Sequence, residues 1–334
     1  MALLSIIVPV YNVALYLEDG LSSILNQNLK DAEFICIDDK STDQSLKILQ
    51  RYAAIDDRIK IIEHEQNKGL SAARNTGIKS AKGKYIVFFD PDDFVEPDMY
   101  TSMIHKMEED SCDIVMCGFK TYPDNRVVIP NFSTIVCNPY DFIKQNKKIH
   151  SSNDLCFSWR FLFNRKFLIE KHLFFIEEIR YAEDMVFNLN AIMQAVRIVL
   201  LPLPLYVYRV NNAMSITKQK YNLYMEVSLQ KQVEEKKRII AKYHINQYTP
   251  ITKDMSEDIV KRFTIMLLNN LKHNEQEIDK RKGTERIINM PMIQKAAQIV
   301  GFRNIYSNLK EYIFYLAIKF RITSVVYRIY FKDK

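Results

Sequence analysis

Glycine is scarce in this chain, with 7 residues among 334. That is about 2%, whereas average usage is about 7%. The seven positions form neither G-x-G-x-x-G nor G-x-x-x-x-G-K-[ST]. Both loops need glycine because the backbone must approach a phosphate group closely. A dinucleotide-binding turn and a Walker-type phosphate loop are therefore excluded, and a bound nucleotide would be held by other groups.

Signals for zinc, secretion and membrane spanning are also lacking. The five cysteines form no C-x-x-C pair and the six histidines form no H-x-H or H-E-x-x-H pattern, so no zinc site is expected. No apolar run approaches the roughly 18 residues of a membrane helix. Residues 3–10 lack the basic leader and cleavage site of a signal peptide. An odd number of cysteines spread through a long chain indicates reduced thiols and a reducing, cytoplasmic compartment.

The net charge of +7 is unevenly distributed. Residues 1–217 carry 24 Lys and Arg against 28 Asp and Glu, whereas residues 218–334 carry 23 against 12. A basic C-terminal third beside a mildly acidic body indicates that the two parts meet different partners.

The order of apolar runs predicts an α/β fold followed by a helical region. Strands are expected at 4–10, 34–38, 59–64, 85–89 and 113–119, and helices around 14–27, 41–53, 69–81 and 97–110. Apolar strands separated by helices predict a mostly parallel sheet with helices on both faces. Helical periodicity dominates after this region, with breaks expected near 248–250, 282–283 and 291. We therefore expect a catalytic domain at 1–220 and a helical domain at 221–334.

Polar residues follow each of the first four strands, at 11–12, 38–43, 67–75 and 90–93. The carboxyl ends of parallel strands meet at one edge of a sheet, where ligands bind in such folds. The sequence therefore places a binding site at this edge. Ser41 and Ser71 could instead serve as helix N-caps.

Three carboxylates lie close together at Asp90, Asp92 and Asp93. They repel one another, and a divalent cation would remove that cost. Carboxylates on a short loop suit Mg²⁺ or Mn²⁺ held jointly with a substrate phosphate. The alternative is a solvated acidic loop in which one aspartate caps the next helix.

Four motifs occur in order: V-P-V-Y-N at 8–12, I-D-D-K-S-T-D at 37–43, N-K-G-L-S-A-A-R-N at 67–75 and F-F-D-P-D-D at 88–93. Together they resemble the signature of GT-A-fold glycosyltransferases of family 2, over roughly residues 1–217. The resemblance implies a Rossmann-like GT-A domain, a nucleotide-diphosphate sugar donor, a divalent metal and inversion of the anomeric centre.

The resemblance also assigns roles to individual residues. It implies that the donor nucleotide is bound by Pro9, Tyr11, Asn12, Asp39, Asn67, Arg74 and Asp90. Tyr11 would lie against the base, and Asp39, ranked above Asp38, would accept from an N–H such as uracil offers. Asp92 would ligate the metal, with Asp93 sharing that role. Two alternatives stay open: a surface salt bridge for Arg74 and a packed aromatic ring for Tyr11.

A second carboxylate pair lies at Glu183 and Asp184. Transfer to a sugar hydroxyl needs a base, because an alcohol is a poor nucleophile until its proton leaves. The segment E-D-M-V-F at 183–187 resembles the family element that supplies it, with Asp184 as the base and Glu183 orienting the acceptor. An acidic pair opening a helix is also what the helix dipole favours.

Three further residues match the family's acceptor or diphosphate side. Trp159, the only tryptophan, would stack on an acceptor sugar or else belong to the core. Arg209 would neutralise the diphosphate, as a guanidinium does well, or pair with an acidic loop. Ser215 matches the segment that follows the base.

The C-terminal end predicts one basic amphipathic helix at about 308–331. Lys310, Arg321, Arg328 and Lys332 would form a narrow stripe on it. This stripe would bind an anionic membrane surface, where lipid-linked acceptors are found. Alternatively, the helix packs on its neighbours or on a second subunit of a homo-oligomer. No motif supports a nucleic acid partner.

The sequence therefore predicts a metal-dependent, inverting glycosyltransferase that uses a UDP-sugar and a saccharide or lipid-linked acceptor. We expect it to build a bacterial surface polysaccharide in the cytoplasm, at the inner face of the membrane. The alternatives are a nucleotidyltransferase acting on a sugar phosphate and a non-catalytic glycan-binding or scaffolding protein.

Overall fold

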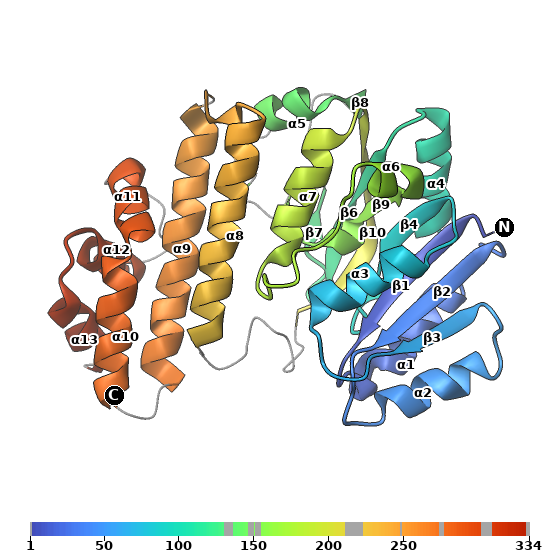
Figure 1. Cartoon of the computed structure of the whole chain (residues 1–334), viewed down its shortest axis with the longest axis horizontal. Coiled ribbons are helices and arrows are strands. Elements are labelled where there is room, and N and C mark those ends of the chain that lie inside the picture. Colours follow the sequence, from blue (N-terminus) through green and yellow to red (C-terminus); the bar gives the residue numbers. More distant parts are fainter. Residues whose placement is uncertain are drawn as a thin grey trace. The chain divides into compact units, whose positions relative to one another are not determined.

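The computed structural model describes residues 2–129, 136–145, 150, 155–210, 223–247, 249–273, 277–301 and 309–331. The chain forms two compact units (Figure 1). The α/β unit comprises Met1–Asn146 and Asp154–Ile216, and the helical unit comprises Lys147–Asn153 and Thr217–Lys334. The sequence did not indicate that the segment at 147–153 belongs with the helical unit.

The α/β unit contains one sheet with the strand order β3-β2-β1-β4-β9-β6-β10-β5. These strands are β1 (Leu4–Val10), β2 (Ala32–Asp38), β3 (Ile59–Glu63), β4 (Tyr85–Phe88), β5 (Phe94–Val95), β6 (Ile114–Tyr122), β9 (Phe161–Asn164) and β10 (Ile198–Arg209). The pairs β3–β2, β2–β1, β1–β4 and β6–β10 are parallel, while β9 and β5 run antiparallel to their neighbours. Two short strands, β7 (Val127–Val128) and β8 (Val136–Cys137), pair with β6 and β10.

Helices cover both faces of this sheet, which confirms the predicted α/β class. Apolar side chains of α1 (Ala14–Leu25), α2 (Ser45–Ala53) and α4 (Met99–Glu109) form one core with β1, β2 and β4. The opposite face is covered by α3 (Leu70–Ser80) and α7 (Glu183–Gln194). Three shorter elements, α5 (Pro139–Gln145), η1 (Ser158–Arg160) and α6 (Arg165–Glu170), complete the unit. The burial of both sheet faces explains the continuous apolar strands.

Strands β9 and β10 were not predicted from the sequence. In β10 the register shifts between Leu201 and Tyr206, at a segment that contains two prolines. Proline removes a backbone donor and weakens the strand signal in a sequence. β10 is nevertheless important for the site, because its end carries Tyr206 and Arg209.

The helical unit contains α8 (Leu223–Lys242), η3 (Ile245–Gln247), α9 (Thr249–His273), α10 (Glu277–Asn289), α11 (Pro291–Val300), α12 (Leu309–Lys319) and α13 (Thr323–Phe331). Pro291 begins a helix, in agreement with the predicted break. The break expected at 282–283 is wrong, because α10 continues through Gly283. A Cβ there would meet the amide of Asn270 at 2.7 Å, so glycine serves close packing of α10 on α9.

The single C-terminal helix expected from the sequence is also wrong. It is divided into α12 and α13 by a turn at which Arg321 has φ +57°. One continuous helical stripe can therefore not carry all four basic residues. The side chains of Lys310, Arg328 and Lys332 lie outside the described residues. None of the helices that the structure describes combines the length and the hydropathy needed to span a membrane.

Candidate active site

The loop after β1 is joined to the loop after β2. Asn12, at φ +50°, accepts through its Oδ1 from the backbone N–H of Thr42 at 2.7 Å. Its own N–H donates to Ser41 Oγ at 3.2 Å, so Ser41 braces a neighbouring loop and does not cap a helix. Pro9 is buried in β1, whereas Tyr11 is 50% exposed. Tyr11 is therefore an accessible ring at the edge of the sheet, and it is not packed in the core.

Asp38 and Asp39 point into different environments. Both oxygens of Asp39 accept backbone N–H groups at 2.8 Å, Oδ1 from Lys68 and Oδ2 from Gly69. Asp38 Oδ2 accepts from the N–H of Ser41 at 3.1 Å. Its Oδ1 is buried and receives no hydrogen bond from any described residue. Asp39 therefore fixes the loop before α3, and Asp38 retains unused acceptor capacity.

The start of α3 is shaped by Gly69, which has φ +91° and precedes the helix. Residues other than glycine rarely adopt this backbone conformation. A Cβ at this position would also lie 3.3 Å from Nε of Arg180. Asn67 is exposed, and its Nδ2 donates to the carbonyl of Asp39 at 3.2 Å.

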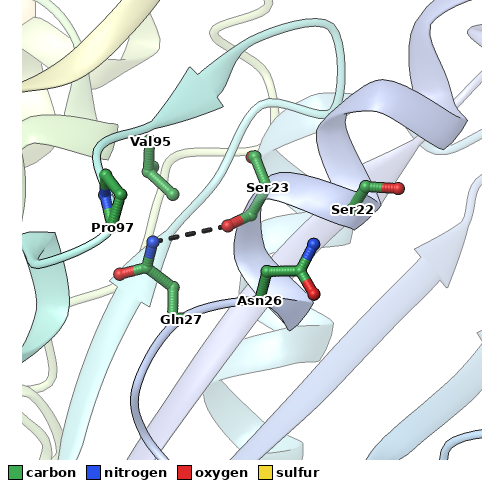
Figure 2. A pocket seen from close by; sticks show the side chains of 6 residues that line it. All are labelled: Ser22, Ser23, Asn26, Gln27, Val95 and Pro97. Carbon is green, nitrogen blue, oxygen red and sulfur yellow. Dashed lines mark hydrogen bonds between the residues drawn. The ribbon is translucent and has the colours of Figure 1, made fainter.

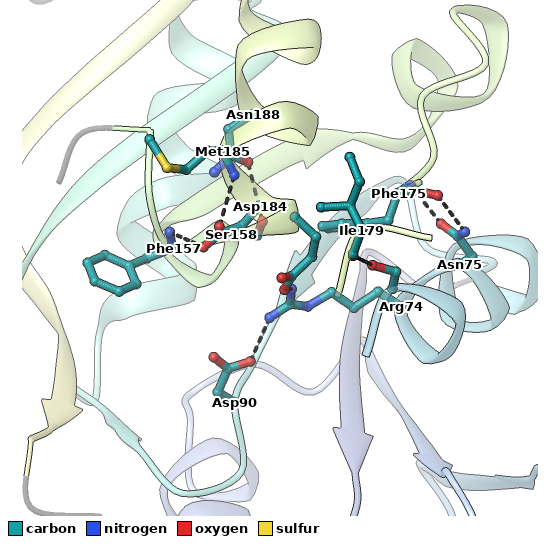
Figure 3. A network of polar contacts seen from close by, with 12 residues as sticks. Arg74, Asn75, Asp90, Phe157, Ser158, Phe175, Ile179, Asp184, Met185 and Asn188 are labelled. Atoms are coloured by element: carbon teal, nitrogen blue, oxygen red, sulfur yellow. Dashed lines mark hydrogen bonds and ion pairs between the residues drawn. The ribbon is translucent and has the colours of Figure 1, made fainter. Parts of the chain in front are cut away.

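Arg74 joins two of the predicted acidic groups, as Figure 3 shows for its bond to Asp90. Its Nη1 donates to Glu183 Oε1 at 2.8 Å and its Nη2 donates to Asp90 Oδ1 at 3.0 Å. The guanidinium is buried and lies over the rings of Phe88 and Phe175. Arg74 is therefore a buried link between the acidic loop and α7, and it is not a surface salt bridge.

Glu183 and Asp184 open α7, which follows Ala182 at φ +55°. Burial raises the pKa of Glu183 to about 7, the charge of Asp184 adds to this, and Arg74 opposes it. Asp184 is only partly buried, and its Oδ2 accepts from the backbone N–H of Phe157 at 2.5 Å. The pair therefore divides into a buried glutamate tied to Arg74 and a more accessible aspartate.

The segment before α7 is held by α3, which the sequence did not reveal. The side-chain amide of Asn75 forms two hydrogen bonds with the backbone of Phe175 (Figure 3). Its Nδ2 donates to the carbonyl at 2.9 Å, and its Oδ1 accepts from the N–H at 2.8 Å. Its amide also donates to Glu177 Oε1 at 3.0 Å. Ser71 donates to the carbonyl of Ile179 at 3.0 Å from inside α3, so it is not an N-cap. These bonds fix the approach to Glu183 and Asp184.

The three aspartates of the acidic loop are not equivalent. Asp93 is fully buried, its Oδ2 accepts from the hydroxyl of Tyr206 at 2.9 Å, and its Oδ1 accepts from the N–H of Arg209 at 2.7 Å. Burial and the charges of Asp92 and Asp90 raise the pKa of Asp93 well above its usual value. Tyr206 Oη also accepts from the N–H of Asp90 at 3.3 Å. Asp93 therefore anchors the loop to β10.

Arg209 likewise contacts this loop. Its Nε donates to the carbonyl of Asp92 at 2.8 Å, and its Nη2 lies 3.3 Å from Asp19 Oδ2. The guanidinium lies over the rings of Phe94 and Tyr16, at 4.4 and 4.9 Å. Arg209 therefore contacts the acidic loop through a backbone carbonyl, and its guanidinium pairs with the carboxylate of Asp19 on α1.

Trp159 is a core residue, with 1% of its surface exposed. It stacks on Tyr206 at a ring distance of 3.8 Å and on Phe157 at 4.8 Å. These contacts favour the packing alternative over stacking on a sugar. Ser215 lies outside the described residues.

A shallow pocket of about 320 Å³ lies where the last turns of α1 face β5 (Figure 2). Its lining consists of Ser22, Ser23, Asn26, Gln27, Val95 and Pro97. The Gln27 amide donates to the carbonyl of Glu96 at 2.8 Å. The pocket contains none of the predicted site residues.

The acidic loop (Asp90, Asp92 and Asp93) fits a divalent cation that takes some of its ligands from the loop and the others from a substrate. Asp92 is partly accessible and Asp90 uses only Oδ1 for Arg74, whereas both oxygens of Asp93 are engaged. Among the described residues no group of three or more metal-ligating side chains is preassembled. Magnesium-type sites commonly use one or two carboxylates and complete their shell with phosphates and water.

Comparison with known proteins identifies the family of this chain. The family model for glycosyl transferase family 2 matches residues 5–173. EpsJ, an uncharacterized glycosyltransferase of Bacillus subtilis, is 35% identical over 99% of this chain and 96% of its own. The poly(ribitol-phosphate) beta-glucosyltransferase of Bacillus spizizenii is 34% identical over 58% of this chain and 30% of its own.

A solved structure shows the same fold. S. aureus TarS 1–349 in complex with UDP-GlcNAc has a TM-score of 0.69 at 19% identity, over 98% of this chain and 90% of that chain. The predicted GT-A architecture is confirmed, and the nucleotidyltransferase and scaffolding alternatives receive no support. The protein is a glycosyltransferase related to enzymes of polysaccharide biosynthesis, and the chain belongs to glycosyl transferase family 2.

Proposed function

We propose that the protein transfers a sugar from a UDP-sugar to a hydroxyl of a saccharide or lipid-linked acceptor, with inversion. The bridge made by Arg74 carries this proposal. It connects Asp90, on the donor side of the site, with Glu183, which is adjacent to Asp184. The buried guanidinium of Arg74 therefore joins the loop expected to bind the sugar donor to the segment that carries the proposed base. The UDP-GlcNAc complex of the TarS neighbour supports the choice of donor.

The nucleotide would bind at the edge formed by β1 and β2. The exposed ring of Tyr11 offers a face on which a base can stack. Asp39, which directly follows β2, presents an ordered carboxylate that would accept a hydrogen bond from the base. The N3–H of uracil is a donor of the required kind.

The acidic loop would receive the diphosphate together with Mg²⁺ or Mn²⁺, held by Asp92 and by the second oxygen of Asp90. When bound, the cation supplies positive charge that offsets the charge of the diphosphate leaving group. Asp93 holds the loop against β10 through its hydrogen bonds with Tyr206 and Arg209.

Asp184 would act as the base. It takes the proton of the acceptor hydroxyl while that oxygen forms a bond to the anomeric carbon. The bond between this carbon and the diphosphate oxygen breaks, and the configuration inverts because attack comes from the opposite side. Glu183, held by Arg74 at 2.8 Å, orients the start of α7.

Replacement of the base tests this function. Asp184→Asn should lower transfer at least about 100-fold, the lower range for a positioned general base. UDP affinity should stay within about two-fold. Glu178→Gln, an exposed carboxylate in the segment before α7, is the matched control and should retain full transfer. Full activity of Asp184→Asn would overturn the assignment of the base.

We also propose that the helical unit contacts an anionic membrane through the turn between α12 and α13. Phe320 and Ile322 are 55% and 42% exposed there, and they alternate in the sequence with the basic residues Lys319 and Arg321. Apolar side chains between basic ones fit the interface of an anionic bilayer, where each basic residue contributes about 1 kcal/mol. A lipid-linked acceptor would be found at the same surface.

Liposomes that contain anionic lipid test this contact. The double variant Phe320→Ser, Ile322→Ser should lose co-sedimentation, while Ile299→Ser, an exposed residue on α11, should not. Unchanged binding of the double variant would contradict the proposal. A concentration-dependent change of mass that the double variant abolishes would instead identify the turn as a contact between subunits.

A further inference from the structure

We infer that His64 is a positioning residue that makes Asp39 selective for nucleobases carrying a ring N–H donor, such as uracil or guanine. This inference rests on the proposed function, because it concerns the nucleotide of the donor. The sequence motifs include Asp39 but not His64. The geometry places both in one buried chain of hydrogen bonds between β2 and α3.

His64 directly follows β3 and lies beside the end of β2. Its backbone N–H donates to the carbonyl of Asp38 at 2.9 Å, which extends the parallel pairing of the two strands. The side chain is 6% exposed. Its Nδ1 lies 2.7 Å from Asp39 Oδ1, and its Nε2 lies 2.9 Å from Thr76 Oγ1 in α3. The ring therefore has a partner on each side.

The donors and acceptors of this chain follow from the chemistry of its groups. An ionised carboxylate only accepts hydrogen bonds, so Nδ1 of His64 must carry a proton. The hydroxyl of Thr76 can donate to Nε2 of a neutral ring or accept from Nε2 of a protonated one. In either case Thr76 fixes the ring and the ring donates to Asp39.

Three donors then surround the carboxylate of Asp39. Oδ1 accepts from His64 and from the N–H of Lys68, while Oδ2 accepts from the N–H of Gly69. A carboxylate offers about four acceptor positions, so one remains, on Oδ2. Because bonds on both oxygens prevent rotation of the carboxylate, the direction of this last position is fixed.

A fixed acceptor selects ligands by their donors. Uracil presents N3–H and guanine presents N1–H, and either can donate to Oδ2. Cytosine and adenine present an unprotonated ring nitrogen at the corresponding edge, which would leave two acceptors facing each other. Such a mismatch is costly in a buried site because neither group finds a partner. His64 contributes by holding the carboxylate of Asp39 in one orientation.

Three variants separate this role from simple packing. His64→Leu removes both ring nitrogens and leaves an apolar side chain. In His64→Asn the amide nitrogen can replace Nδ1, so the donor to Asp39 is restored. Thr76→Val keeps the shape of the threonine and removes the hydroxyl that fixes the ring. Calorimetry with UDP, GDP and CDP, each with Mn²⁺, measures the base preference, and steady-state kinetics gives KM and kcat for the donor.

We expect His64→Leu to weaken UDP binding about ten-fold, the effect of losing one hydrogen bond to a charged group. CDP binding should change less than two-fold, so that the preference for UDP falls by nearly the same factor as UDP affinity. The loss should appear in the donor KM more than in kcat. His64→Asn should recover UDP affinity to within about three-fold of wild type, and Thr76→Val should lie between the two.

Two results would overturn the inference. One is a His64→Leu variant that binds UDP as tightly as wild type does. The other is an equal loss for UDP and CDP that His64→Asn does not restore, since that indicates a structural role alone. If wild type binds neither UDP nor GDP, the proposed donor class itself fails and this inference falls with it. The wild-type titration therefore distinguishes the two failures.

Discussion

Tyr206 provides the sharpest test of how the acidic loop is held. Its hydroxyl donates to Asp93 Oδ2 at 2.9 Å and accepts from the N–H of Asp90 at 3.3 Å. The substitution Tyr206→Phe keeps the ring that stacks on Trp159 and removes both bonds. Asp93 is then left with a buried oxygen that has lost its donor.

The size of the effect follows from the charge of Asp93. A hydrogen bond to an ionised group contributes about 1.5–3 kcal/mol, and one between neutral groups contributes about 1 kcal/mol. Burial already raises the pKa of Asp93, and loss of the Tyr206 donor raises it further. A carboxyl group whose pKa is raised on folding loses stability as pH rises through that value. The variant should therefore be more destabilised at high pH than at low pH.

Thermal unfolding monitored across pH measures this. For a unit of this size about 2–4 °C correspond to 1 kcal/mol, so we expect Tm to fall by about 3–12 °C above the raised pKa of Asp93 and by less below it. The apparent affinity for Mn²⁺ should weaken as well, because the loop loses an anchor. Tyr208→Phe, in the same strand and the same aromatic stack, is the control. Equal Tm values for Tyr206→Phe and wild type at every pH would refute the reasoning.

Three further predictions concern Gly20, Glu183 and Trp159. Gly20→Ala should lower Tm and Mn²⁺ affinity, because a Cβ would overlap the carbonyl of Pro91, whereas Leu15→Ala, 78% exposed on the same helix, should change neither. In the fold the pKa of Glu183 is raised to about 7, so wild type should lose stability as this group ionises between about pH 5 and 7. Glu183→Gln lacks this group, so its Tm should rise relative to that of wild type over the same range. A constant Tm difference at all pH values would contradict this. Trp159→Leu should lower Tm and leave the acceptor KM unchanged, and a selective rise in that KM would return Trp159 to the acceptor site.

The gathering of polar groups at one edge of the sheet was predictable because it depends on local patterns. β1 begins and ends where its apolar run does, and the polar groups that follow β1 to β4 lie at one edge of the sheet. The bond from Arg74 to Asp90 joins two such groups that the sequence had already assigned to the donor side.

The orientation of individual side chains was not predictable in the same way. Asp92 and Asp93 are neighbours in one motif, yet only Asp93 is fully buried, because its partner Tyr206 lies 113 residues away on a strand that the sequence did not reveal. Trp159 is covered by the same tyrosine. Long-range packing decided both cases, and periodicity carries no information about it.

The C-terminal helices show a similar limit. A regular spacing of basic residues predicted one helix, but a residue at positive φ can end a helix without a glycine or proline signal, as Arg321 does. At Gly283 the opposite happened, since a glycine that reads as a break in the sequence lies inside α10 and allows close packing.

Calorimetric titration of the wild-type protein with UDP, in the presence and absence of Mn²⁺, tests the central claim most directly. The account predicts saturable binding that Mn²⁺ strengthens and that Asp92→Asn makes insensitive to the metal, with CDP binding much more weakly. A folded protein that binds no nucleoside diphosphate under these conditions would contradict it.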